Sequence, residues 1–78
     1  MIPLYGFRQG DTIGLLVLAD ERDSMAVLAG KLQSAASVRV APHPLVHVEV
    51  RGERVAPNLT VRQVGLTALD RFDVREGE

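Results

Sequence analysis

Residues 23–36 read DSMAVLAGKLQSAA, and this stretch decides the fold because its apolar residues follow a helical period. Spacings of three and four residues place them along one helical face. The residues on this face are Met25, Leu28, Ala29, Leu32, Ala35 and Ala36. Asp23 or Ser24 can cap the first turn, since either side-chain oxygen can accept from an unpaired backbone N–H. We therefore expect one helix of about twelve residues.

The segments before this helix are predicted to form an antiparallel β-hairpin. Ile2 and Leu4 open an apolar-rich strand that stops at the turn formers of residues 8–11. Residues 12–19 form a short, continuous apolar run, which favours a central strand covered on at least one face. The connection between the two strands is tight enough for a hairpin.

The segments after the helix are predicted to return to the sheet. Pro42 and Pro44 forbid regular helix, so the chain crosses over there. Residues 45–50 alternate in the manner of a half-buried strand, with His47 and Glu49 on a face that we expect to be wet. A turn at residues 51–54 leads to a brief strand at residues 55–56.

A short helical turn and a last strand are expected to complete the chain. One irregular or single-turn helix is expected from the apolar residues Leu59, Val61, Val64 and Leu66, and Gly65 is expected to end it. Phe72 and Val74 then alternate with charged residues in a final strand.

This order of elements predicts an α+β fold, the ubiquitin-like β-grasp, over residues 1–78 as a single domain. One main helix would cross a mixed sheet of four to five strands, because a single apolar helical stripe needs a single apolar sheet face. The expected shared core is Leu16, Leu18, Leu28, Leu32, Val48 and Phe72.

The composition excludes several classes of function. The formal net charge is -1 and there is no cysteine, so thiolate zinc sites, iron–sulfur clusters and cysteine nucleophiles are unavailable. No basic block favours nucleic acid, and no apolar run reaches the roughly 20 residues of a membrane span. These features predict a cytoplasmic protein that binds neither nucleic acid nor membrane.

Candidate catalytic and metal-binding residues are sparse. His43 and His47 are four apart, but the flanking prolines make a helical ligand pair improbable. The acidic cluster at residues 20–23 suits helix capping, and the serines lie where serine commonly bonds the backbone. We therefore predict no catalytic, cofactor-binding or metal-binding residue, and no enzyme activity for this chain by itself. The ending REGE also lacks the diglycine of ubiquitin-like carriers, which leaves a packing or interaction module.

The sequence resembles a specific family, the small ubiquitin-like subunit (system protein B, or gamma) of toluene and related aromatic or alkene multicomponent diiron monooxygenases. The resemblance lies in the order and spacing of short segments along nearly the whole chain. These segments are Ile2-Pro3-Leu4 with Phe7 and Asp11, Val17-Leu18-Ala19-Asp20, Asp23-Ser24-Met25, Val38-Arg39-Val40-Ala41-Pro42, Val48-Glu49-Val50-Arg51, Pro57 with Thr60-Val61, Gly65-Leu66, Leu69-Asp70 and Phe72-Asp73-Val74.

The resemblance implies a noncatalytic subunit that packs on the alpha and beta hydroxylase subunits. The diiron centre would lie in the large alpha subunit, and this chain would hold no cofactor. Electrons would arrive from NADH through a reductase and a Rieske ferredoxin for hydroxylation of an aromatic or alkene substrate. The alternative is an independent ubiquitin-like protein-interaction domain, for example of a secretion or regulatory system.

The predicted partner contact is the segment that follows the helix. Arg39, Val40, Pro42 and His43, together with Tyr5, are the candidates, because two prolines make this crossover rigid. Arg39 is the best anchor, since its guanidinium can pair with a partner carboxylate at two points. Equally open is the interpretation that the segment only closes the connection from helix to strand.

Overall fold

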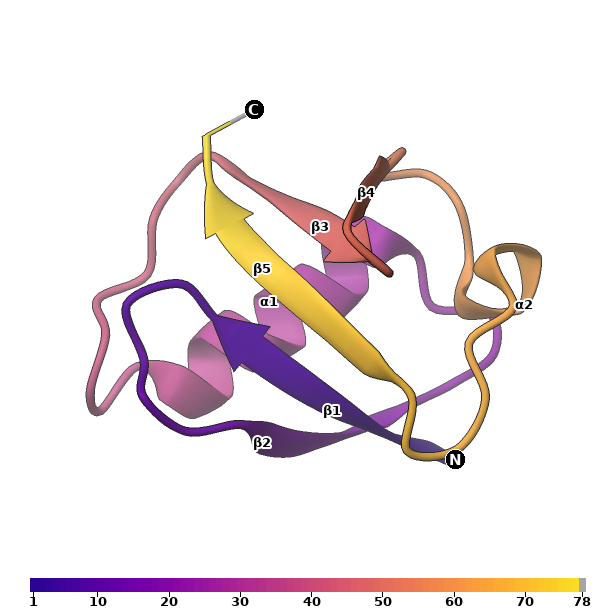
Figure 1. Cartoon of the computed structure of the whole chain (residues 1–78), viewed down its shortest axis with the longest axis horizontal. Helices are drawn as coiled ribbons and strands as arrows, with labels where there is room; N and C mark the ends of the chain where they lie inside the picture. The colour runs from indigo at the N-terminus through magenta and orange to yellow at the C-terminus, as the bar shows by residue number, and fades with distance from the viewer. Residues whose placement is uncertain (78) are drawn as a thin grey trace.

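One long helix crosses one face of a five-stranded sheet in the computed structural model, which describes residues 1–77 (Figure 1). The elements in chain order are β1 (Ile2–Arg8), β2 (Leu15–Ala19), α1 (Met25–Ala36), β3 (Val46–Val50), β4 (Glu53–Val55), α2 (Val61–Val64) and β5 (Arg71–Glu76). The strands lie in the order β2-β1-β5-β3-β4, and β1 and β5 pair in parallel while the other pairs are antiparallel. The expected mixed sheet with one main helix is confirmed.

Helix α1 has the predicted length and begins at the predicted cap. It spans 12 residues, and the hydroxyl of Ser24 accepts from the backbone N–H of Val27 at 3.1 Å. Asp23 serves a different role, because its carboxylate accepts from the backbone N–H of Asp20 at 2.9 Å. The helical face is buried as expected except at Ala35, which is exposed.

The core between α1 and the sheet contains four of the six expected side chains. Leu28, Leu32, Val48 and Phe72 are buried there, with Leu32 and Phe72 fully inaccessible. Gly6 of β1 allows this packing, because a Cβ at that position would lie 2.7 Å from Phe72 Cζ and 2.8 Å from Leu32 Cδ1. The helix and sheet therefore approach each other at a point where only glycine fits.

The prediction for Leu16 and Leu18 is wrong. Their exposed fractions are 55% and 54%, whereas Val17 and Ala19 are buried under α1. The register between β1 and β2 decides this, because it pairs the inward-facing Leu4 with Val17. A continuous apolar run has no alternation, so its inward phase is ambiguous without a pairing partner.

Strand β2 also lies at the edge of the sheet, where a central strand was predicted. Its apolar run favoured a central position with a strand on each side, but β1 is its single neighbour among the described residues. Lys31 of α1 partly protects the edge, since its Nζ donates to the Leu18 carbonyl at 3.1 Å and to Asp23 Oδ2 at 2.6 Å. A lysine at a sheet edge discourages pairing with further strands.

The segment from β4 to β5 follows the predicted order with small shifts. β4 covers Glu53–Val55 where residues 55–56 were expected, so Glu53 and Arg54 of the predicted turn belong to the strand. Helix α2 is a single turn with a reciprocal cap, in which Thr60 and Gln63 each accept from the other's backbone N–H. Gly65 ends α2 with a left-handed φ of 83°, which confirms it as the stop.

Candidate interaction surface

The crossover after α1 is fastened to the body of the protein by a buried arginine. Arg8, at the end of β1, is 2% exposed, and its Nε donates to Gln33 Oε1 of α1 at 3.1 Å. Its terminal nitrogens donate to the carbonyl oxygens of Gln9 at 2.7 Å and Ala41 at 3.4 Å. Gln33 in turn accepts from the backbone N–H of His43 at 2.8 Å and donates to the His43 carbonyl at 3.1 Å.

Arg8 also reaches the last strand, because both of its terminal nitrogens lie 3.3 Å from Glu76 Oε2. One guanidinium therefore joins β1, α1, the crossover and β5, and the buried charge is paired and hydrogen-bonded. The sequence-based prediction assigned Arg8 to a turn and missed this role. The available signal was its phase, since it continues the inward alternation of Leu4 and Gly6.

Arg39 pairs at two points with a carboxylate of its own chain, whereas the prediction concerned a carboxylate of a partner. Its Nε lies 3.1 Å from both Asp11 oxygens and its Nη2 lies 2.9 Å from Oδ2, so the crossover is tied to the β1–β2 turn. The hydrogen bonds from Arg39 are the largest cause of a lowered Asp11 pKa, and this pair likewise raises the Arg39 pKa. The same guanidinium is partly exposed, so it is accessible to a partner while it is paired with Asp11.

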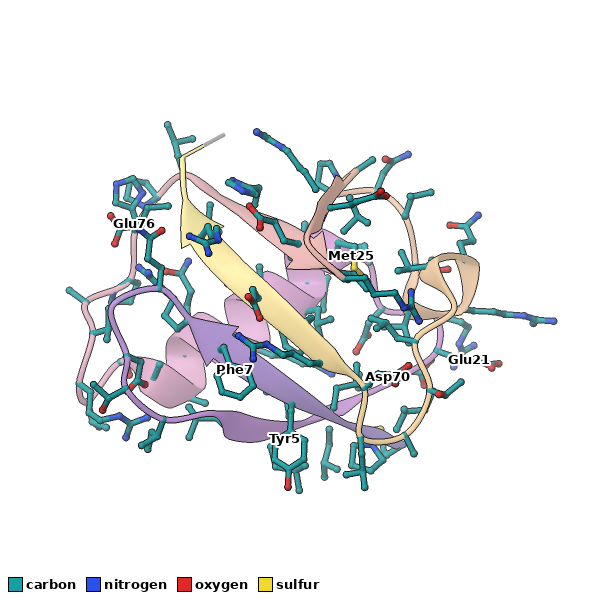
Figure 2. All side chains as sticks on the ribbon, in the orientation of Figure 1. Tyr5, Phe7, Glu21, Met25, Asp70 and Glu76 are labelled. Atoms are coloured by element: carbon teal, nitrogen blue, oxygen red, sulfur yellow. The ribbon has the colours of Figure 1, made fainter. Side chains whose placement is uncertain are left out.

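The five predicted contact residues lie in two separate places. Arg39, Val40, Pro42 and His43 follow α1, and Pro42 is exposed while Val40 and His43 are half-buried. Tyr5 points away from α1 on the other face of the sheet (Figure 2). The partner contact through these residues stays a prediction, and any such contact needs two surfaces.

The sheet face that α1 leaves uncovered is apolar along β1 and β2. We call it the open sheet face, and its apolar half consists of Pro3, Tyr5, Phe7, Leu16 and Leu18. The register places Tyr5 opposite Leu16 and Pro3 opposite Leu18, so these side chains form one continuous patch.

Phe7 marks the border of this apolar half and is held from two sides. A Cβ on Gly14 would lie 2.6 Å from Phe7 Cζ, so the ring packs closely over that glycine. The Arg71 guanidinium lies 4.0 Å from the ring centroid, which is the geometry of a cation–π contact. Gly14 is therefore required by the packing of an aromatic ring.

The other half of the open sheet face is charged. Arg71 and Asp73 pair at 2.8 Å on β5, and Arg75 of β5 pairs with Glu49 of β3 at 3.2 Å. His47 Nε2 lies 2.8 Å from Glu49 Oε2, and both side chains are half-buried on the face predicted to be wet. The arginines of these pairs are more exposed than the acids, at 62% against 25% and 50% against 23%.

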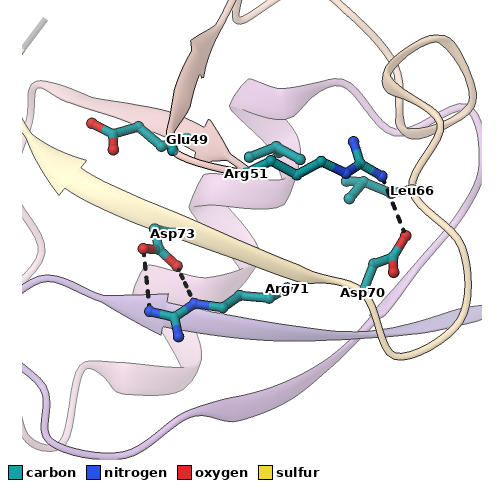
Figure 3. A pocket seen from close by; sticks show the side chains of 8 residues that line it. Glu49, Arg51, Leu66, Asp70, Arg71 and Asp73 are labelled. Atoms are coloured by element: carbon teal, nitrogen blue, oxygen red, sulfur yellow. Dashed lines mark hydrogen bonds and ion pairs between the residues drawn. The ribbon is translucent and has the colours of Figure 1, made fainter.

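A hollow of about 310 Å³ adjoins this charged half at the end of β3 and the start of β5 (Figure 3). Its charged lining is already paired, with Arg51 lying 3.9 Å from Asp70 and Arg71 lying 2.8 Å from Asp73. Hydrogen bonds from Thr67 to the Asp70 carboxylate are the main cause of that residue's lowered pKa. The hollow contains carboxylates held by arginine and backbone, and no nucleophile beside a base.

Within residues 1–77, no three His, Asp or Glu side chains come together to hold a metal ion. In that range, too, neither helix is long and apolar enough to cross a membrane.

Comparison with known proteins identifies the family. The sequence model described as toluene-4-monooxygenase system protein B matches residues 1–75. The chain belongs to the toluene-4-monooxygenase system protein B family. The resemblance noted from the sequence is thereby confirmed. No curated protein sequence matches the chain.

Solved structures agree with this system protein B assignment. A chain of the toluene 4-monooxygenase HD complex with the inhibitor 4-bromobenzoate is 26% identical, with a TM-score of 0.89, and the match covers 97% of this chain and 98% of that one. Ubiquitin from Caldiarchaeum subterraneum is 10% identical with a TM-score of 0.76, covering 99% of this chain and 94% of that one. A chain from a study of molecular mimicry of SUMO is 20% identical with a TM-score of 0.75, covering 94% and 88%. The last two likenesses concern the fold alone, and they confirm the ubiquitin-like prediction.

Proposed function

We propose that this system protein B is the small, noncatalytic subunit of a multicomponent aromatic or alkene monooxygenase hydroxylase. The observation that carries the proposal is the match over almost the full length of both this chain and a chain of the toluene 4-monooxygenase complex. The side chains support a packing role, because the buried Arg8 and the acids Glu49, Asp73 and Glu76 are engaged in contacts that hold the fold.

The remaining roles in the complex fall to its partners. In this proposal the alpha subunit holds the diiron centre, the beta subunit completes the hydroxylase, and NADH supplies electrons through separate proteins. This chain acts as a single domain in the cytoplasm and contributes surface, with no cofactor of its own.

Co-expression with the alpha and beta hydroxylase subunits of the same organism tests the proposal. We expect the full chain to elute with them in size-exclusion chromatography, and iron analysis of the separated subunits to find metal with alpha. Hydroxylation of toluene is also measured, and alpha and beta expressed without this chain are the control for that measurement. Failure of the wild-type chain to join the other subunits would favour the independent interaction domain.

The predicted contact through the crossover needs a control for the internal pair. Arg39→Ala removes both a possible partner anchor and the contact to Asp11, whereas Asp11→Asn weakens the same contact and leaves the guanidinium in place. If Arg39 is an anchor, Arg39→Ala weakens assembly by roughly thirtyfold or more, the loss that a desolvated arginine anchor can give, and Asp11→Asn does not. Equal assembly of both variants and wild type would leave the segment with the role of closing the connection.

A further inference from the structure

We propose that the open sheet face docks a segment of the large hydroxylase subunit, with apolar side chains opposite Tyr5, Leu16 and Leu18 and carboxylates opposite Arg71 and Arg75. This inference rests on the proposed function and names the surface through which it would be performed. It also places the main contact on the strands of the sheet, whereas the sequence-based prediction placed it on the crossover after α1.

The apolar half supplies the hydrophobic part of the contact. Tyr5, Leu16 and Leu18 are 43%, 55% and 54% exposed and are neighbours across the β1–β2 pair. Other exposed aliphatic residues lie on other elements, for example Val27 on α1 at 48%. Single exposed apolar residues are ordinary on protein surfaces, but a continuous patch with an aromatic residue marks a binding surface.

The charged half specifies the chemistry of the occupant. On this face, Arg54, Arg71 and Arg75 stand against Asp73 and Glu49, which gives the face a formal charge of +1 in a chain whose net charge is -1. The acids lie lower than the guanidiniums in exposure, so an approaching partner meets arginine first. Carboxylates on the partner complement this half and steer the encounter.

The two halves are adjacent, so one segment can engage both. β1 and β5 pair directly, and the register places Tyr5 beside Arg71 and Phe7 beside Asp73. The contact of Arg71 with the Phe7 ring fixes the border between the halves before any partner arrives. A second copy of this chain matches the surface poorly, because it would bring the same exposed guanidiniums rather than free carboxylates.

Affinity of the purified full chain for the purified alpha and beta subunits tests the inference. The apolar variant is Leu16→Thr with Leu18→Thr, because threonine keeps strand propensity, and its control is Val27→Thr on α1. The charge variant is Arg75→Glu, and its control is Arg62→Glu on α2. Thermal unfolding of each variant verifies that it folds.

We expect each open-face variant to bind at least about tenfold more weakly, the smaller end of the effect of a buried contact residue, while the controls bind as wild type does. The loss from Arg75→Glu should shrink at high salt, since exposed charges are screened. Wild-type binding that both open-face variants retain would overturn the inference and leave the proposed function standing. Absence of wild-type binding would instead overturn the proposed function. A dimer of the isolated chain that the threonine variant abolishes, with unchanged binding to alpha and beta, would assign the face to a second copy and also overturn the inference.

Discussion

The two faces of the sheet differ in polarity on β3 and β5 and are much alike on β1 and β2. On β3 and β5, valine and phenylalanine point toward α1, and the charged residues other than Glu76 point away, so the pattern separates inside from outside. On β1 and β2, both faces are largely apolar, and one is buried by α1 while the other remains open. On β1 and β2, an apolar side chain therefore does not indicate burial within this chain. It can instead mark a surface that binds another protein.

Loss of a core side chain on the covered face should give the largest effect. Leu32→Ala removes a fully buried side chain of α1 and should lower the free energy of unfolding by roughly 2 to 5 kcal/mol. Leu16→Ala on the open face should change it by about 0.5 kcal/mol or less. Urea denaturation followed by circular dichroism measures both. Similar midpoints for the two variants would remove the distinction between the faces and the packing of α1.

Adding a methyl group to a glycine should cost more stability on the covered face of the sheet than on the open face. Gly6→Ala drives a methyl group into Phe72 and Leu32, and we expect a loss of about 1 to 3 kcal/mol. Gly14→Ala makes an equally close approach to Phe7, but that ring is half-buried on the open face, whereas Phe72 and Leu32 are fully buried, so the loss should be smaller. Thermal melts of the two variants rank them, and a larger loss at Gly14 would contradict this account.

A methyl group on the outer side of α1 should have the opposite sign. Gly30 lies in the middle of the helix with nothing within 4 Å of the position of an added Cβ. Gly30→Ala should stabilise the protein by about 0.5 to 1 kcal/mol, because alanine loses less backbone entropy in a helix. A denaturation midpoint at or below that of wild type would show that this helical surface is less free than the structure indicates.

The smallest expected effect concerns pH at the edge where α1 meets β2. Hydrogen bonding to Lys31, followed by the backbone N–H of Asp20, lowers the pKa of Asp23. A lowered pKa means that the contribution is present above about pH 4, the ordinary range of aspartate, and is lost as the pH falls through the lower folded-state value. Asp23→Asn should therefore be less stable than wild type at neutral pH, and the difference should be smaller at about pH 2. An equal difference at both pH values would exclude this linkage.

The sequence predicted those parts of the fold that have a single period. The alternation in β3 and β5 and the helical spacing in α1 each favour one orientation, and the structure agrees with them. The phase of β2 was not predictable, because Leu15, Leu16, Val17 and Leu18 are all apolar and pairing with β1 makes the choice. Long-range register is not encoded in a local window.

The candidate surface was harder to predict from the sequence than the fold was. Arg39 was predicted to pair with a partner carboxylate at two points, and the structure shows it paired with Asp11 of the same chain, 28 residues away in sequence. Arg8 and Gln33 meet only after the crossover has closed, so neither residue alone indicates their contact with the backbone of His43. Tyr5 was the single predicted contact that lies on the open sheet face.

The position of β5 in the sheet determines when the open sheet face is formed. β5 is the last described strand in the chain, yet it lies in the middle of the sheet between β1 and β3. During translation, the hairpin and α1 leave the ribosome without Phe72 and Val74, and the sheet remains divided until the distant residues 2–8 and 71–76 have met. Such non-local closure is slow compared with the formation of a hairpin or a helix. Arg71 and Arg75 come from the same strand, so a partner that recognises the open sheet face can recognise only a chain that has already folded.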